Sequence, residues 1–259
     1  MEAALTLDEA LNPEGCLFCR RHDGGFRSEE HIFSQGLGNT TYVLPPGIVC
    51  DRCNNGPLSV ADHALTDFSP IVLLRAERGL PTKAGKPVAA KFGNATVYFS
   101  APGELVVETN SKKATRRMAP GGGQLDLTSG GPMTATRFRS MARAVWKSAL
   151  ELVYLDYGPS GSFDPVFDSL RRHVLGEGGT EGWMVCPKNG EAHNHVELRY
   201  EPRFVEGRKA CPAMFDIFGF RLYTDLLRRD LKEAYIASTT PWPANVWVFL
   251  KLAAESRSC

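Results

Sequence analysis

The chain has 259 residues, 43% of them apolar and 23% charged, which excludes a disulfide miniprotein and a chain that is disordered throughout. Its apolar runs are far shorter than the roughly 18 residues of a membrane helix. Its first residues also lack the pattern of a secretory signal, so we expect a cytoplasmic protein with no membrane partner. The net charge of +1 conceals uneven blocks: residues 1–68 hold 4 basic and 10 acidic residues, residues 69–148 hold 13 and 4, and residues 149–259 hold 13 and 15.

A short N-terminal arm at residues 1–13 precedes a segment, Cys16 to about Phe68, that is rich in cysteine, glycine and asparagine. Two Cys-x-x-Cys pairs, Cys16 with Cys19 and Cys50 with Cys53, are separated by 30 residues. This spacing is typical of a zinc site in a reducing compartment, because each pair can direct two sulfurs to one tetrahedral ion. Four thiolate ligands leave the ion no open position, so we predict a structural rather than a catalytic Zn²⁺.

An acid–histidine pair, Glu30-His31, lies between the cysteine pairs, and Asn54 directly follows the last cysteine. Together with the cysteines, these residues resemble the HNH, or His-Me finger, nucleases. The similarity is greatest to the branch with a four-cysteine zinc site, which includes phage Holliday-junction endonucleases. The resemblance covers residues 14–68, about a quarter of the chain. It implies a ββα-metal finger in which the histidine lies on the first strand and the asparagine on the helix.

The resemblance also implies a role for each residue. His31 would be the general base that removes a proton from the attacking water, which a neutral imidazole can do near pH 7. Glu30 and Asn54 would bind one catalytic Mg²⁺ or Mn²⁺, which would stabilise charge on the scissile phosphate. Aspartate is commoner before the histidine in this family. Glu29 therefore stays open as an alternative to Glu30, which we prefer, and Asn55 as an alternative to Asn54.

The remainder, residues 69–259, is expected to form a domain of unassigned role. In chain order the patterns predict a helix at 70–78, strands within 86–109, a long helix at 134–155 with a basic side, and a helix at 165–175. Four later segments, 183–186, 195–200, 214–223 and 245–250, are typical of strands, and Asn189-Gly190 predicts a hairpin between the first two. The predicted fold class is α+β, with a zinc-stapled ββα finger at residues 14–68 followed by a mixed α+β domain.

Basic residues of the middle block are candidates for binding nucleic acid, because the finger itself is acidic and phosphate contacts must come from elsewhere. The candidates are Lys112, Lys113, Arg116, Arg117, Arg137, Arg139 and Arg143. Lys147 shares the basic side of the long helix. Charge segregation of this kind is also found on a solvated face that balances acidic neighbours.

The sequence thus predicts a metal-dependent endonuclease that hydrolyses phosphodiester bonds and nicks or cleaves DNA, which we expect as substrate ahead of RNA. One finger contains one active centre, so a double-strand break would require a homodimer or two successive events. Two other interpretations stay open. One is a catalytically inactive zinc finger that binds nucleic acid or acts as a scaffold, and the other is a defence nuclease that is gated by a ligand at the C-terminal domain.

Overall fold

The computed structural model describes residues 14–82, 84–92, 95–101, 104–109, 115–118, 135–177, 186–205 and 208–227. Helices and antiparallel sheets are combined within these ranges, which confirms the predicted mixed α+β class. The predicted arm at 1–13 and the predicted strand at 245–250 lie outside the described residues, as does most of the predicted strand at 183–186. No helix in the described part of the chain has the length and apolar character needed to span a membrane.

The helical elements follow the predicted order. The finger, residues 14–68, contains η1 (Gln35–Leu37), α2 (Asp51–Cys53), the π-helical turn η2 (Asn54–Leu58) and α3 (Ser59–Thr66). After it come α4 (Ser69–Glu77), α5 (Ala135–Ser162), η3 (Pro165–Phe167) and α6 (Asp168–Val174). Asp164 accepts a hydrogen bond from the Val166 amide at 2.8 Å and begins the helical segment there, as expected of an N-cap. Gly158 is non-helical, with φ 64° and ψ −159°, so it breaks α5 before the last turn.

Three antiparallel sheets contain the strands. The first has the order β1-β2-β3-β4, with β1 (Ala90–Phe92), β2 (Ala95–Ala101), β3 (Glu104–Thr109) and β4 (Thr115–Met118). The second has the order β5-β10-β9-β6, with β5 (Cys186–Asn189), β6 (Val196–Tyr200), β9 (Pro212–Ile217) and β10 (Phe220–Asp225). The third pairs β7 (Arg203–Val205) with β8 (Arg208–Ala210).

Two predictions for the second sheet are wrong. The predicted hairpin at Asn189-Gly190 would pair β5 with β6, but β5 pairs with β10 and β6 with β9, so two strands separate them. The segment 214–223 is not one strand but parts of β9 and β10, joined by a turn at Phe218 and Gly219. Both turn residues have positive φ, 58° and 94°, as a tight hairpin turn requires. Phenylalanine is uncommon in such a turn, which concealed it from the sequence pattern.

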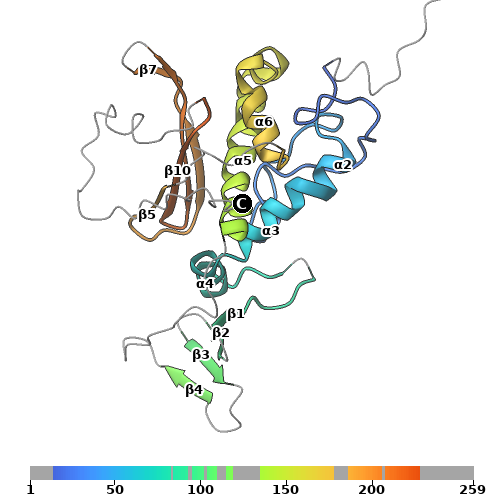
Figure 1. Ribbon diagram of the computed structural model, residues 1–259. Helices are drawn as coiled ribbons and strands as arrows, with labels where there is room; N and C mark the ends of the chain where they lie inside the picture. Colours follow the sequence, from blue (N-terminus) through green and yellow to red (C-terminus); the bar gives the residue numbers. More distant parts are fainter. Residues whose placement is uncertain are drawn as a thin grey trace, which may run out of the picture.

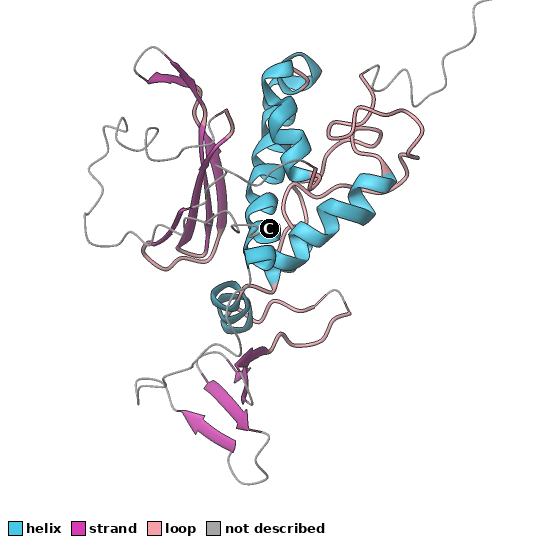
Figure 2. Ribbon diagram, in the orientation of Figure 1, coloured by secondary structure: helices cyan, strands magenta, loops and turns pink. Residues whose placement is uncertain are grey.

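Helix α5 lies at the centre of the molecule, between the finger on one side and the second sheet on the other (Figure 1). Its apolar residues recur at helical spacing, and those along its middle, including Met141, Val145, Trp146 and Ala149, are at most 1% exposed. The first sheet and α4 lie at one end of this arrangement (Figure 2). The long helix thus provides one apolar surface against which the finger can pack.

One continuous hydrophobic core joins the finger to α5, α6 and the second sheet. Phe33 of the finger, for example, packs edge-to-face on Phe215 of β9, with ring centroids 5.8 Å apart. A smaller core joins α4 to the first sheet through Val72, Val97 and Val107. The predicted domain boundary at residue 68 stays a prediction, but core side chains from both sides of it belong to the same cluster.

Candidate metal centre and active site

Four cysteine side chains come together where the first turn of the finger meets the start of α2. The sulfurs of Cys16, Cys19, Cys50 and Cys53 all lie within 4.8 Å of one another, and the Sγ atoms of Cys19 and Cys50 are 3.7 Å apart. A tetrahedral zinc with Zn–S bonds of ~2.3 Å separates its sulfurs by about 3.8 Å, so this spacing fits such an ion. The hydrogen bond between Cys19 and Cys16 lowers the pKa of Cys19 and raises that of Cys16, so the cluster holds its protons unevenly. These four residues could therefore hold a zinc-like metal, as their spacing predicted.

The backbone brings the two cysteine pairs together. The Leu17 amide donates to the Ile48 carbonyl at 2.9 Å, and the Cys50 amide donates to Sγ of Cys16 at 3.3 Å. Gly24 passes directly over Cys50, because a Cβ atom at Gly24 would lie only 2.7 Å from the Cys50 sulfur. Any larger residue at position 24 would displace one of the metal ligands.

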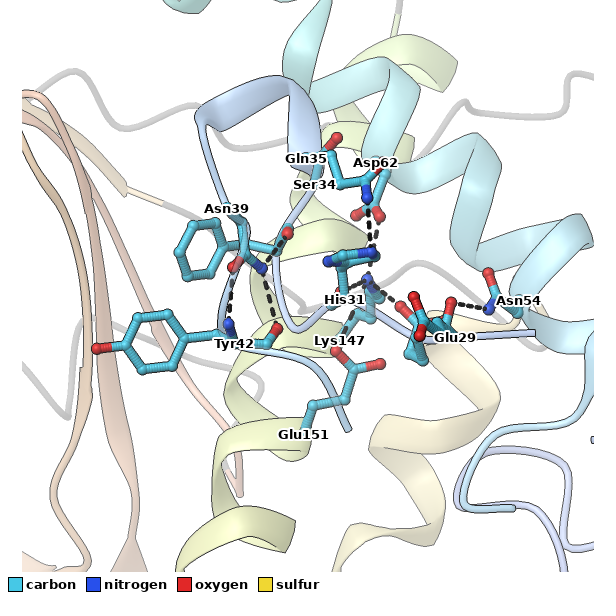
Figure 3. A network of polar contacts seen from close by, with 12 residues as sticks. Glu29, His31, Ser34, Gln35, Asn39, Tyr42, Asn54, Asp62, Lys147 and Glu151 are labelled. Carbon is cyan, nitrogen blue, oxygen red and sulfur yellow. Dashed lines mark hydrogen bonds and ion pairs between the residues drawn. The ribbon is translucent and has the colours of Figure 1, made fainter. Parts of the chain in front are cut away.

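His31 lies on a short antiparallel strand pair between the two cysteine pairs. It forms a β-bridge with Val43, and backbone hydrogen bonds on either side connect residues 30–32 with residues 42–44. The second of these segments leads to Cys50 and to α2, so two short extended segments, joined by one isolated β-bridge, are followed by a helix at the cysteine cluster. The imidazole is half-buried and contacts Gln35, whose side-chain nitrogen is 2.9 Å from its Nε2 (Figure 3).

Asn54 connects the start of the helical segment to the strand that carries His31. Its side-chain amide donates to the Glu29 carbonyl at 2.8 Å (Figure 3). No hydrogen bond from any described residue reaches its side-chain oxygen, which leaves that oxygen available to a ligand. Asn55, the alternative, instead bonds back to the carbonyl of Asp51 and to the Ser28 hydroxyl, each at 3.0 Å. Of the two asparagines, Asn54 is therefore the one that contacts the segment leading to His31, through the Glu29 carbonyl.

Glu30 and Glu29 are in different environments. The Glu30 side chain is only 4% exposed, and its Oε1 lies 2.5 Å from Nζ of Lys147 in α5. Glu29 is exposed, and its backbone contacts Asn54. The preferred sequence candidate is thus committed to a buried ion pair, whereas the carboxylate of the alternative is open to solvent.

Lys147 is the centre of a buried ionic cluster beneath His31. Its ammonium is fully buried and contacts carboxylates from three segments: Glu30, Asp62 of α3 at 3.0 Å, and Glu151 of α5 at 3.6 Å. It also donates to the backbone carbonyl of His31 at 2.7 Å. The expectation that Lys147 lies on a solvated basic side of the helix is therefore wrong, because its charge is compensated inside the protein.

Burial and charge act in opposite directions in this cluster. Burial raises the pKa of Glu30, of Asp62 and, most strongly, of Glu151. Burial alone would lower the pKa of Lys147, but Asp62, Glu151 and Glu30 outweigh it and raise that pKa. Lys147 is accordingly the group whose charge its neighbours favour, and Glu151, whose carboxylate is farthest from the ammonium, is the acid whose pKa burial raises most.

Three residues of this site were missing from the sequence prediction: Gln35, Asp62 and Lys147. The sequence held one signal for the last, since Glu151 follows Lys147 at the i,i+4 spacing of a helical ion pair. The sequence held no such signal for Gln35 or Asp62, because η1 and α3, which carry them, come close to His31 only in the folded chain.

The predicted nucleic-acid-binding residues fall on two separate elements. Lys112 and Lys113 lie outside the described residues. Arg116 and Arg117 belong to β4, whereas Arg137, Arg139 and Arg143 belong to α5. Arg139 and Arg143 are half-buried, and within the described ranges no carboxylate forms an ion pair with either. Burial, with a smaller contribution from Arg139, lowers the pKa of Arg143.

Comparison of the chain with models of protein families, with curated proteins and with solved structures found no match. The functional argument therefore rests on the residues and geometry of the site.

Proposed function

We propose that this protein is a metal-dependent endonuclease of the HNH type, which hydrolyses phosphodiester bonds in DNA with His31 as general base. One observation carries the proposal: Asn54, at the start of the helix that leaves the four-cysteine cluster, donates a hydrogen bond to Glu29, two residues before His31. Two extended segments joined by a β-bridge and followed by a helix agree with the finger that the sequence resemblance implies. The cysteine cluster would hold a structural zinc, which leaves the chemistry to the neighbouring polar residues.

A second, hard cation would take its oxygen ligands from the residues around His31. Mg²⁺ and Mn²⁺ prefer carboxylate and amide oxygens, and Mg²⁺ keeps several waters, so two protein ligands suffice. Asn54 supplies an amide oxygen. The burial of Glu30 against Lys147 favours Glu29 as the carboxylate, although Glu30 was the residue preferred from sequence. When bound, the cation would stabilise negative charge on the scissile phosphate.

The chain's own residues would perform the proton transfer. His31 accepts a proton from the water that attacks phosphorus, while the bond from phosphorus to the leaving oxygen breaks and that oxygen takes a proton from solvent. Gln35 orients the imidazole through Nε2 and gives way to the attacking water when that nitrogen accepts the proton, because Nδ1 is buried. Arg139 and Arg143, which have no carboxylate partner among the described residues, supply positive charge for the phosphate backbone.

A plasmid-nicking assay tests the proposal. Purified protein with Mg²⁺ or Mn²⁺ should convert supercoiled plasmid to the nicked form, and addition of EDTA should stop the reaction. Failure of His31→Ala to lower the rate would exclude His31 as the base, and persistent inactivity of the wild type with either metal would contradict the proposed function.

The two glutamates form a matched pair for locating the cation. Glu29→Gln should raise the metal concentration needed for half-maximal nicking by about tenfold or more, since it removes a charged ligand from an exposed site. Glu30→Gln should leave the metal requirement near that of the wild type while lowering the melting temperature, because Lys147 loses a buried partner. The opposite pattern would identify Glu30 as the ligand.

Gln35→Ala should lower the nicking rate about fivefold, because one orienting hydrogen bond to the imidazole, worth ~1 kcal/mol, is lost. Gln35→Glu replaces the donating amide by an acceptor and should also lower the rate, because it cannot donate to an unprotonated Nε2. Single-turnover rates measured at saturating DNA check this expectation. An unchanged rate in Gln35→Ala would show that His31 needs no orientation by its neighbour.

A second candidate function is a zinc finger that binds nucleic acid without cleaving it. The commitment of Glu30 to Lys147 favours this candidate, because that carboxylate is not open to a cation. Retained DNA binding together with absent nicking in the presence of Mg²⁺ or Mn²⁺ would support it.

A further inference from the structure

The contacts of Lys147 point to a role beyond neutralising buried charge. If Lys147 served only to neutralise buried carboxylates, its contacts with those carboxylates would be sufficient. Lys147 also donates at 2.7 Å to the backbone carbonyl of His31, the residue whose imidazole is proposed to act as base. The same ammonium contacts the side chain of Glu30, the preceding residue. Two consecutive residues of one short strand are thus held from beneath by one fully buried cation.

The strand has few backbone hydrogen bonds of its own, and its other restraints are the burial of Ile32 and Phe33 in the core and the hydrogen bond from Asn54 to Glu29. Residues 30–32 are joined to residues 42–44 by two backbone hydrogen bonds, from the Ile32 amide to the Tyr42 carbonyl at 3.0 Å and from the Leu44 amide to the Glu30 carbonyl at 2.8 Å. So short a ribbon is not stable on its own. Its position relative to the rest of the finger therefore depends on what packs below it.

The ammonium also determines where the strand lies relative to its surroundings. Asp62 contacts Lys147 from α3, and Lys147 extends from α5, so the cluster connects the His31 strand to both helices (Figure 3). The ammonium end of each contact is fully buried, and hydrogen bonds to a buried charged group are stronger than in water.

We propose that Lys147 is a positioning residue, which fixes the strand of His31 against α3 and α5 so that the imidazole is held in place for proton transfer. The inference rests on the proposed function, because it concerns the residue named there as the base. Lys147 itself is fully buried and touches neither water nor substrate.

Hydrogen exchange of single amides tests this role without relying on nuclease activity. In full-length Lys147→Met, the protection of the Ile32 and Leu44 amides should fall at least about tenfold, as expected when a charge-assisted hydrogen bond that holds the strand is lost. The amides of Leu17 and Asn54, which belong to the cysteine cluster, should change much less. Equal loss of protection at all four amides, or no loss at Ile32 and Leu44, would overturn the proposal.

Two further variants keep the test decisive. The double variant Glu30→Gln, Lys147→Met removes both charges of the closest pair. If Lys147→Met alone does not fold, the same exchange measurement is made on the double variant and judged by the same criteria. Arg221→Met is the matched control, because it removes the cation that pairs with buried Asp216 in the second sheet, remote from His31. Protection at Ile32 and Leu44 should stay at the wild-type level in this control, and a similar fall there would overturn the proposal.

Nicking kinetics provide a second readout. If the wild type nicks DNA, Lys147→Met should lower kcat at least tenfold with KM unchanged, since the lysine does not touch substrate. A raised KM with an unchanged kcat, or faster nicking, would overturn the positioning role. If the wild type is inactive, the proposed function fails, and the exchange pattern still decides whether Lys147 positions the strand.

Discussion

Cys50→Ala is expected to unfold the N-terminal part of the protein and to abolish zinc binding. A structural zinc contributes ~10–16 kcal/mol in isolated zinc fingers, whereas the net stability of a whole domain is about 5–15 kcal/mol. Loss of one of four ligands therefore removes an energy comparable with the entire stability of the unit. Metal analysis should show one zinc per chain in the wild type and none in the variant, and thermal melts by circular dichroism should show the loss of structure.

Cys211→Ala is the matched control for this experiment. Cys211 is also a buried free cysteine, but it lies beside β9, away from the four-cysteine cluster. Its substitution removes one sulfur atom from the core and should lower stability only slightly, with zinc content unchanged. If Cys50→Ala retained its zinc and melted like Cys211→Ala, the cluster would not be a metal site.

His31→Ala is expected to lower the rate of DNA nicking by about 10²–10⁴-fold, the usual contribution of a general base. The effect should appear in kcat at saturating DNA, because the imidazole acts on the attacking water rather than on substrate binding. DNA binding, measured separately in the presence of Ca²⁺, should change little. Single-turnover nicking by the two proteins at the same Mg²⁺ concentration provides the comparison.

His22→Ala controls for the loss of an imidazole from the finger. His22 is exposed in the loop after the first cysteine pair, so its substitution should leave both nicking and zinc content at the wild-type level. The His31→Ala protein must also retain one zinc per chain, which separates loss of the base from loss of the fold. Equal nicking by His31→Ala and His22→Ala would refute the proposed mechanism.

Much of the fold could be predicted from local pattern because it is determined locally. The apolar spacing of α5, the Asp164 N-cap and the first three strands of the first sheet depend on residues close in sequence, whereas β4 was not predicted. Strand order in the second sheet depends on long-range pairing, and there the sequence was misleading. Asn189-Gly190 carries the strongest turn signal, yet the hairpin of that sheet turns at Phe218-Gly219, where Asp216 accepts a hydrogen bond from the Gly219 amide at 2.7 Å.

The candidate site was predictable to the extent that it depends on spacing. Two Cys-x-x-Cys pairs are enough to predict four sulfurs around one point, and the structure brings them together. Which of two adjacent glutamates is buried cannot be inferred from their residue type, because the answer depends on Lys147, more than a hundred positions away in sequence. Charge counting placed that lysine with the nucleic-acid-binding arginines, although its partners are buried carboxylates.

The shared core has a consequence for how such a finger can be inherited or engineered. Grafted onto another scaffold as residues 14–68 alone, it would present Phe33 to water without Phe215, and Glu30 would lose its counter-ion. A successful chimera would have to transfer α5 together with the finger. Recombination that separates the two segments should therefore be selected against, even though nearly seventy positions lie between them.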